Sequence, residues 1–216
     1  MDYETLKTRH REVRDDYHQN LNLRVHRALS WLNRAEQCED GDSQFIFLWI
    51  AFNAAYANEI GEGDKSPEQK VFGQFIAKLV DLDKDEALYK LIWEEYPGSI
   101  RVLLDNKYVF QPFWDHQNGK IEKNQWEKSF QSAKQAAGRA LAEHRTTAVF
   151  TAILSRMYTL RNQLIHGGAT WNSAVNRDQV RDCSTLLGKI VPFIIQLMMD
   201  NPNTLWGDAC YPVVED

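Results

Sequence analysis

Helical periodicity is the feature of this sequence that most restricts its fold. In each long segment rich in apolar residues, these residues recur three and four positions apart, which places them on one face of an α-helix. No segment convincingly alternates apolar and polar residues, as a half-buried strand would. We therefore expect an all-α fold, an antiparallel helical bundle of about four core helices with additional short helices.

Capping and turn residues divide the chain into the expected helices. Residues 44–60 are apolar on nearly every side, which is typical of a helix in the middle of a bundle, and Ser43 is its expected N-cap. Ser66 and Pro67 are expected to begin another helix. Further helices are expected over residues 21–38, 85–95, 99–108, 123–143, 147–166 and 173–200. Residues 111–120 contain Pro112 and Asn118-Gly119 and are expected to form a loop.

The length of 216 residues is enough for one well-buried domain, which we expect to span residues 1–216. Residues 1–20 read as a surface helix or a loosely attached arm, and residues 201–216 as an irregular tail. Trp31, Trp49 and Trp93 lie in apolar patterns and are expected in the core.

The cysteines and the N-terminus indicate the cellular compartment in which we expect the protein. The 3 cysteines have no CxxC spacing, which favours neither a disulfide framework nor a zinc site. The N-terminus lacks the pattern of a signal peptide, and the apolar runs read as too short or too interrupted to span a bilayer. A cytoplasmic protein with no membrane partner, no metal and no cofactor is therefore expected.

The charge is unevenly distributed along the chain. The net charge of −5 argues against a protein that coats nucleic acid non-specifically. Residues 120–189 nevertheless hold eleven Lys or Arg and five Asp or Glu, a net +6, which leaves −11 for the remainder. This basic region indicates either a surface that contacts RNA or an ordinary solvated face.

The segment from Arg161 to Gly168 combines an arginine, an amide and a histidine near a predicted helix end. Asn162 and His166 lie four residues apart and share one edge of the helix with Tyr158. Arg161 lies roughly 140° from His166 and must reach round to this edge. Gly167 is expected to end the helix in the left-handed conformation, where the helix C-terminus favours a protonated imidazole.

The run Arg161-Asn162-Gln163-Leu164-Ile165-His166 resembles the R-x4-H signature of the HEPN superfamily. The helix that carries Trp49 to Tyr56 is similar to the aromatic second helix of Apea-like and related HEPN domains. The resemblance covers residues 22–60 and 123–200, and leaves 62–120 as a possible family-specific insertion. It implies a helical bundle that dimerises so that two motifs meet. Many members are metal-independent endoribonucleases that act as toxins, in anti-phage defence or in RNA processing.

The resemblance and the residue chemistry together assign the expected roles. His166 would act as acid or base, Arg161 would hold the phosphate, and Asn162 would orient the imidazole or the ligand. Attack by the RNA 2′-OH would give a 2′,3′-cyclic phosphate. The expected substrate contacts are Arg156, Tyr158, Trp171 and Arg177, and Asn53 is the expected supporting residue behind the site. The expected partners are RNA, a second copy of the chain and an antitoxin or regulatory protein.

Each of these residues also has a structural alternative. Arg161 can close a helix end or pair with a buried carboxylate, and His166 can bond a backbone carbonyl. Asn53 can hydrogen-bond between helices, because an unpaired buried amide costs about 1–3 kcal/mol. Trp171 can pack across a dimer interface, and Arg177 can pair with the adjacent Asp178. For the whole protein, the alternative is a non-catalytic HEPN module that binds a nucleotide or a partner protein and mediates dimerisation.

Overall fold

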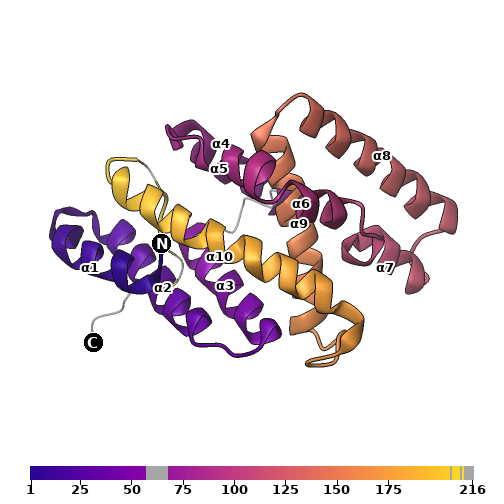
Figure 1. The fold of residues 1–216 in the computed structure, drawn as a ribbon, viewed down its shortest axis with the longest axis horizontal. Coiled ribbons are helices and arrows are strands. Elements are labelled where there is room, and N and C mark those ends of the chain that lie inside the picture. Colours follow the sequence, from indigo (N-terminus) through magenta and orange to yellow (C-terminus); the bar gives the residue numbers. More distant parts are fainter. Residues whose placement is uncertain (57–67, 205, 210, 212–216) are drawn as a thin grey trace. The chain divides into compact units, whose positions relative to one another are not determined.

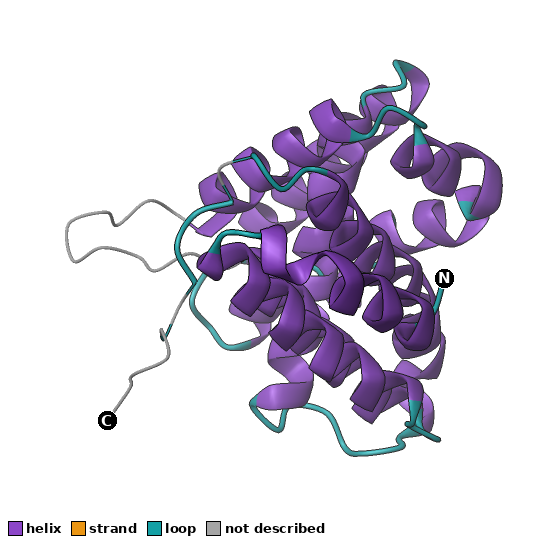
Figure 2. Ribbon diagram, turned by 90° about the vertical axis from the view of Figure 1, so that its left-hand side faces the viewer, coloured by secondary structure: helices purple, strands orange, loops and turns teal. Residues whose placement is uncertain are grey.

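The computed structural model describes residues 1–56, 68–204, 206–209 and 211, without the side chains of 68–72 and 176. Within these ranges the chain forms ten α-helices, three 3-10 turns and one π-helical turn, and it contains no strand. Figure 2 shows purple helices joined by short teal loops. The predicted all-α class is confirmed.

The chain divides into two compact units. One consists of Met1–Glu68 with Trp171–Asp216, and the other of Gln69–Thr170. The prediction of a single domain, with 62–120 as an insertion, stays a prediction.

The first unit is a bundle of four helices (Figure 1). These are α1 (Tyr3–Val13), α2 (Gln19–Glu36), α3 (Gly41–Tyr56) and α10 (Arg177–Asp200). Helix α3 packs against both α2 and α10, as expected for a helix that is apolar on nearly every side. The largest buried side chains of this core include Leu29, Phe45, Trp49 and Phe52.

Helix α1 is attached more firmly than its charged sequence indicates. Its buried residues, Leu6 and His10, are one turn apart and face the bundle. The Tyr3 backbone N–H donates to the Glu36 carboxylate over 2.9 Å, and Arg9 forms an ion pair with Asp200. Residues Tyr3–Val13 therefore form a helix whose buried face and polar contacts hold it to the bundle.

Acidification below about pH 6.5 should lower the free energy of unfolding of this bundle. Burial lowers the pKa of His10, whose Nδ1 has no hydrogen-bond partner among the described residues. An unfolded histidine has a pKa of about 6.5, so in acid the unfolded chain binds the proton that the folded chain resists. The contribution of neutral His10 to the free energy of unfolding is thus complete above the pKa of an unfolded histidine. It is lost as the pH falls towards the lowered pKa of His10 in the folded state.

Urea unfolding at a series of pH values from about 7 down to about 5 measures this effect. His10→Gln cannot titrate and should give a flatter dependence, with the residual slope coming partly from His26, whose pKa is also lowered by burial. An equally steep dependence in the variant would show that His10 is not responsible.

Helix α3 begins at Gly41, three residues before the expected start at Gln44. Asp40 Oδ1 accepts the Ser43 backbone N–H over 2.8 Å, so Asp40 caps the helix and the predicted cap, Ser43, lies inside it. This hydrogen bond is the largest of the effects that lower the pKa of Asp40. The predicted end of this helix at 57–60 and the predicted cap at Ser66 and Pro67 lie outside the described residues.

Helix α10 is long and apolar enough to cross a bilayer by length and composition. Two thirds of its apolar stretch (67%) is buried inside the structure, as in the core helix of a bundle. Pro192 lies within this helix.

The second unit contains the remaining helices. They are α4 (Glu68–Leu82), α5 (Ala87–Lys90), α6 (Pro97–Leu104), α7 (Gln111–Gln117), α8 (Lys123–Ala142) and α9 (Thr146–Ile165), with a π-helical turn over Leu91–Glu95. Helix α9 packs against α6 and α8, and α7 packs against α8. The buried face of α9 includes Phe150, Ile153, Met157 and Leu160, as its periodicity predicts.

The predicted loop over residues 111–120 is largely wrong. Residues Gln111–Gln117 form α7, with Pro112 in its first turn, where proline removes no helical hydrogen bond. Only the end of the segment turns as expected, at Gly119 with φ +70°.

Candidate functional site

The candidate site lies at the end of α9, where the helix is fixed by its buried face and by its C-terminal turn. The His166 backbone N–H donates to the Asn162 carbonyl over 3.1 Å, and the Gly167 N–H donates to the Leu164 carbonyl over 3.3 Å. Gly167 has φ +69°, the left-handed conformation that ends many helices. The predicted helix end at His166 and Gly167 is confirmed.

Gly167→Ala should lower the free energy of unfolding by about 1–2 kcal/mol, the cost of placing a Cβ in the left-handed region. A Cβ at Gly167 would meet no atom within 4 Å, so the cost is conformational and not steric. The matched control is Gly98→Ala in α6, where the added Cβ also meets open space but φ is not positive. Chemical denaturation of both variants checks this, and equal effects would contradict it.

Arg161 reaches round the helix to the edge that Asn162 occupies. Its Nη1 donates to Asn162 Oδ1 over 2.9 Å, and its guanidinium carbon lies 5.7 Å from the centre of the Tyr158 ring. The Nε of Arg161 is buried and has no hydrogen-bond acceptor among the described residues. We call the contiguous group of Tyr158, Arg161 and Asn162 the Arg161 cluster. One donor of its guanidinium, Nε, is unpaired among the described residues.

His166 follows this cluster as the C-cap residue, directly after the last residue of α9, Ile165. Its side chain is exposed, and within the described part of the chain it makes no hydrogen bond, so the alternative in which it bonds a backbone carbonyl is not observed. An exposed imidazole can meet a substrate. In a single chain, however, no described residue orients it, and Asn162 bonds Arg161 instead.

The predicted role of Arg156 in substrate binding is not compatible with its position. Arg156 is only 6% exposed, its Nη2 donates to the Leu104 carbonyl over 3.2 Å, and its guanidinium lies over the Phe110 ring at 4.4 Å. Burial lowers the pKa of Arg156 to about 10. Arg156 lies three residues after Ile153 and four before Leu160, on the buried face, so it packs the interior.

Arg177 and Trp171 belong to the first unit, where they fasten the segment before α10 to the start of α3. Arg177 Nη2 contacts both carboxylate oxygens of Asp42, at 2.6 and 2.7 Å, and the Asn172 backbone N–H donates to the same carboxylate over 2.8 Å. Arg177 therefore pairs with Asp42 and not with the adjacent Asp178. Trp171 donates from Nε1 to Asp40 over 3.3 Å, yet remains 69% exposed and accessible to a ligand or partner.

Asn53 is half-buried in α3, so the cost of a fully buried unpaired amide does not apply to it. No hydrogen bond of its side chain is found among the described residues. Its proposed supporting role behind the site stays a prediction.

Sequence reasoning missed two residues that position the candidate site residues. Gln163 donates from Nε2 to the Tyr108 carbonyl over 2.6 Å and ties the last turn of α9 to residues 107–109. Asp42 anchors Arg177 from a distance of 135 residues along the chain. Both contacts depend on the tertiary fold, and no local pattern in the sequence signals them.

The described residues contain no group of three or more His, Cys, Asp or Glu side chains placed to hold a metal ion. Cys183 is buried, and burial raises the pKa of its thiol, which makes it a poor ligand or nucleophile.

Comparisons of the chain with models of protein families, with curated proteins and with solved structures give no significant match. Evidence for function therefore comes from the residues and from their geometry.

Proposed function

We propose that this protein is a metal-independent endoribonuclease of the HEPN type, with Arg161, Asn162 and His166 at its site. The observation that supports the proposal is the reach of Arg161. Its guanidinium lies 2.9 Å from the Asn162 amide oxygen, on the helix edge that leads to the exposed His166. The end of one helix thereby presents Arg161, a hydrogen-bond donor that can hold an anion, and His166, a group that can transfer a proton.

The proposed reaction uses the RNA's own 2′-OH as the nucleophile. A base removes the 2′-hydroxyl proton as the oxygen attacks phosphorus, and an acid protonates the departing 5′-oxygen. The products are a 2′,3′-cyclic phosphate and a 5′-hydroxyl. Arg161 holds the phosphate and offsets the charge that grows on it in the transition state.

This chemistry requires a base and an acid, whereas one copy of the motif supplies a single histidine. In a symmetric homodimer, His166 of one copy acts as the base and its counterpart as the acid. The second copy also provides surroundings that orient the imidazole, which is exposed in one chain. Such an enzyme would act in the cytoplasm, as a toxin held by an antitoxin or in anti-phage defence.

Incubation of the purified protein with mixed RNAs in excess EDTA tests the proposal. We expect cleavage with cyclic phosphate ends, no cleavage of DNA, which lacks the 2′-OH, and a loss of about 10²- to 10⁴-fold in rate for His166→Ala. Arg161→Ala should reduce the rate as well. Absence of cleavage, or cleavage unchanged in His166→Ala, rejects the assignment.

A non-catalytic HEPN module that binds a nucleotide or a partner protein and mediates dimerisation is the second candidate. The observation in its favour is that no described residue orients His166, whereas the Arg161 guanidinium is already held by Asn162 and lies over the Tyr158 ring. A thermal shift induced by a nucleotide, abolished by Arg161→Ala and unaccompanied by RNA turnover, would favour this candidate. Specific RNA cleavage that depends on His166 would exclude it.

A further inference from the structure

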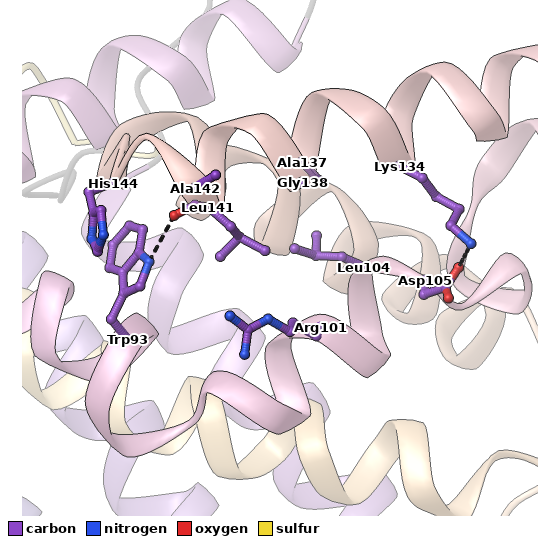
Figure 3. Close-up of a pocket in the computed structure, with 10 residues that line it drawn as sticks. All are labelled: Trp93, Arg101, Leu104, Asp105, Lys134, Ala137, Gly138, Leu141, Ala142 and His144. Carbon is purple, nitrogen blue, oxygen red and sulfur yellow. Dashed lines mark hydrogen bonds and ion pairs between the residues drawn. The ribbon is translucent and has the colours of Figure 1, made fainter.

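A groove of about 500 Å³ lies in the second unit, along α8, and faces the π-helical turn and α6 (Figure 3). Small-molecule sites in proteins usually enclose roughly 300–1,000 Å³. Arg161, Asn162 and His166 do not line the groove, so it is distinct from the proposed RNA site.

One end of the groove is a fixed aromatic wall. Trp93 donates from Nε1 to the Leu141 carbonyl over 3.1 Å, and its ring stacks with His144 at a centroid distance of 5.2 Å. Tyr89 stacks with both rings and bonds His144 Nδ1 over 3.0 Å. His144 has φ +52°, so these contacts hold it in a backbone conformation that residues with a Cβ rarely adopt.

The groove has two cationic side chains, Lys134 and Arg101, which differ in whether they are ion-paired. Lys134 forms an ion pair with Asp105 at the end away from Trp93, so its charge is offset. The Arg101 side chain forms no ion pair or hydrogen bond with any residue that the structure describes. Figure 3 shows its guanidinium extending towards the Trp93 end. The groove therefore offers an unpaired planar donor beside an aromatic wall.

Between the aromatic wall and the ion pair of Lys134 with Asp105, the groove is lined by apolar or small side chains. Leu104 and Leu141 point into it. On the α8 side lie residues with little or no side chain, and a Cβ at Gly138 would meet no atom within 4 Å. A flat ring can therefore lie along α8 between the leucines and the edge of Trp93.

We propose that this groove binds a planar aromatic molecule that carries one anionic group, a phosphate or a carboxylate. The Arg101 guanidinium holds the anion through paired hydrogen bonds, and the ring packs on Leu104 and Leu141 against Trp93. Nucleoside monophosphates and aryl carboxylates share this chemistry.

Isothermal titration of the full-length protein with AMP, indole-3-acetate, adenosine and inorganic phosphate tests the proposal. At least one of the two aromatic anions should bind, about tenfold or more tightly than adenosine or phosphate, because charge-assisted hydrogen bonds add to ring burial. Binding of AMP alone identifies the phosphate class, and binding of indole-3-acetate alone the carboxylate class. AMP contains no phosphodiester, so this result does not depend on RNA cleavage.

Two variants locate the bound ligand. Arg101→Gln removes the cation and should weaken binding about tenfold or more. Gly138→Leu fills the groove and should abolish binding, while leucine's higher helix propensity maintains α8. The matched controls are Arg139→Gln, an exposed arginine on α8 outside the groove, and Gly73→Leu, whose Cβ also meets open space. Failure of both aromatic anions to bind at millimolar concentration, or binding unaffected by Arg101→Gln and Gly138→Leu, overturns the proposal.

Discussion

An equimolar mixture of the wild-type chain and the His166→Ala variant should, after subunit exchange, retain about one quarter of the RNA-cleaving activity of the same total amount of wild-type protein. The reason is statistical, because random pairing in a two-fold dimer leaves only about one dimer in four with two intact histidines. If one His166 is the base and the other the acid, a mixed dimer lacks one of the two proton transfers. Its rate should then fall by about 10²- to 10⁴-fold. Initial rates on a defined RNA, measured after exchange at low protein concentration, give the fraction directly.

One other outcome of this mixing experiment would reject the composite site alone. About one half of the activity would mean that each chain cuts RNA independently, which contradicts the composite site while leaving the ribonuclease assignment intact. His26→Ala supplies the control, since His26 is an exposed histidine on α2 of the first unit and its replacement by alanine preserves helix propensity. Mixtures with His26→Ala should retain nearly full activity.

The helices were predictable where local signals decide them. The expected helices 123–143 and 147–166 correspond to α8 (Lys123–Ala142) and α9 (Thr146–Ile165), because apolar spacing and a capping box or glycine mark their ends. Helix α7 was missed because Pro112 both disrupts helix interiors and favours first turns, and only the surrounding structure selects between these roles. Local patterns also did not reveal the solvent side of α2, where Trp31 is 37% exposed and stacks on Phe47.

In the candidate site too, features set by neighbouring residues were easier to predict than contacts between residues far apart in the chain. The left-handed Gly167 involves only neighbours in sequence and was predicted from them. The bond between Arg161 and Asn162 was not predicted, because adjacent residues of a helix do not face each other and Asn162 was expected to orient the imidazole or the ligand. The prediction that Arg156 contacts the substrate is wrong, although its place on the helix face of Leu160 already favoured burial. The pairing of Arg177 with Asp42 was not readable, since it joins residues far apart in the sequence and depends on how α10 packs against α3.

Arg24→Ala should destabilise the first unit by about 3–5 kcal/mol, the largest effect on stability that we expect from a single substitution. Arg24 is 1% exposed, and among the described residues it donates to three backbone carbonyls: from Nη1 to Ala55 over 2.9 Å, from Nε to Gly207 over 3.2 Å, and from Nη2 to Asp208. Ala55 lies in α3, and its carbonyl is one of the acceptors that the guanidinium holds. Truncation leaves a cavity and removes the donor from all three acceptors.

Arg27→Ala is the matched control, because Arg27 lies nearly one turn later on α2 and donates to the Tyr211 carbonyl from a more exposed position. Its loss should cost less than about 1 kcal/mol, since water can replace an exposed hydrogen bond. Arg24→Lys keeps the charge but lacks the planar fork that reaches several carbonyls, so it should fall between wild type and Arg24→Ala. Urea unfolding monitored by circular dichroism gives this order directly. Equal stabilities of Arg24→Ala and Arg27→Ala would mean that water satisfies the carbonyls at residues 55, 207 and 208, and that Arg24 does not hold the C-terminal segment against the bundle.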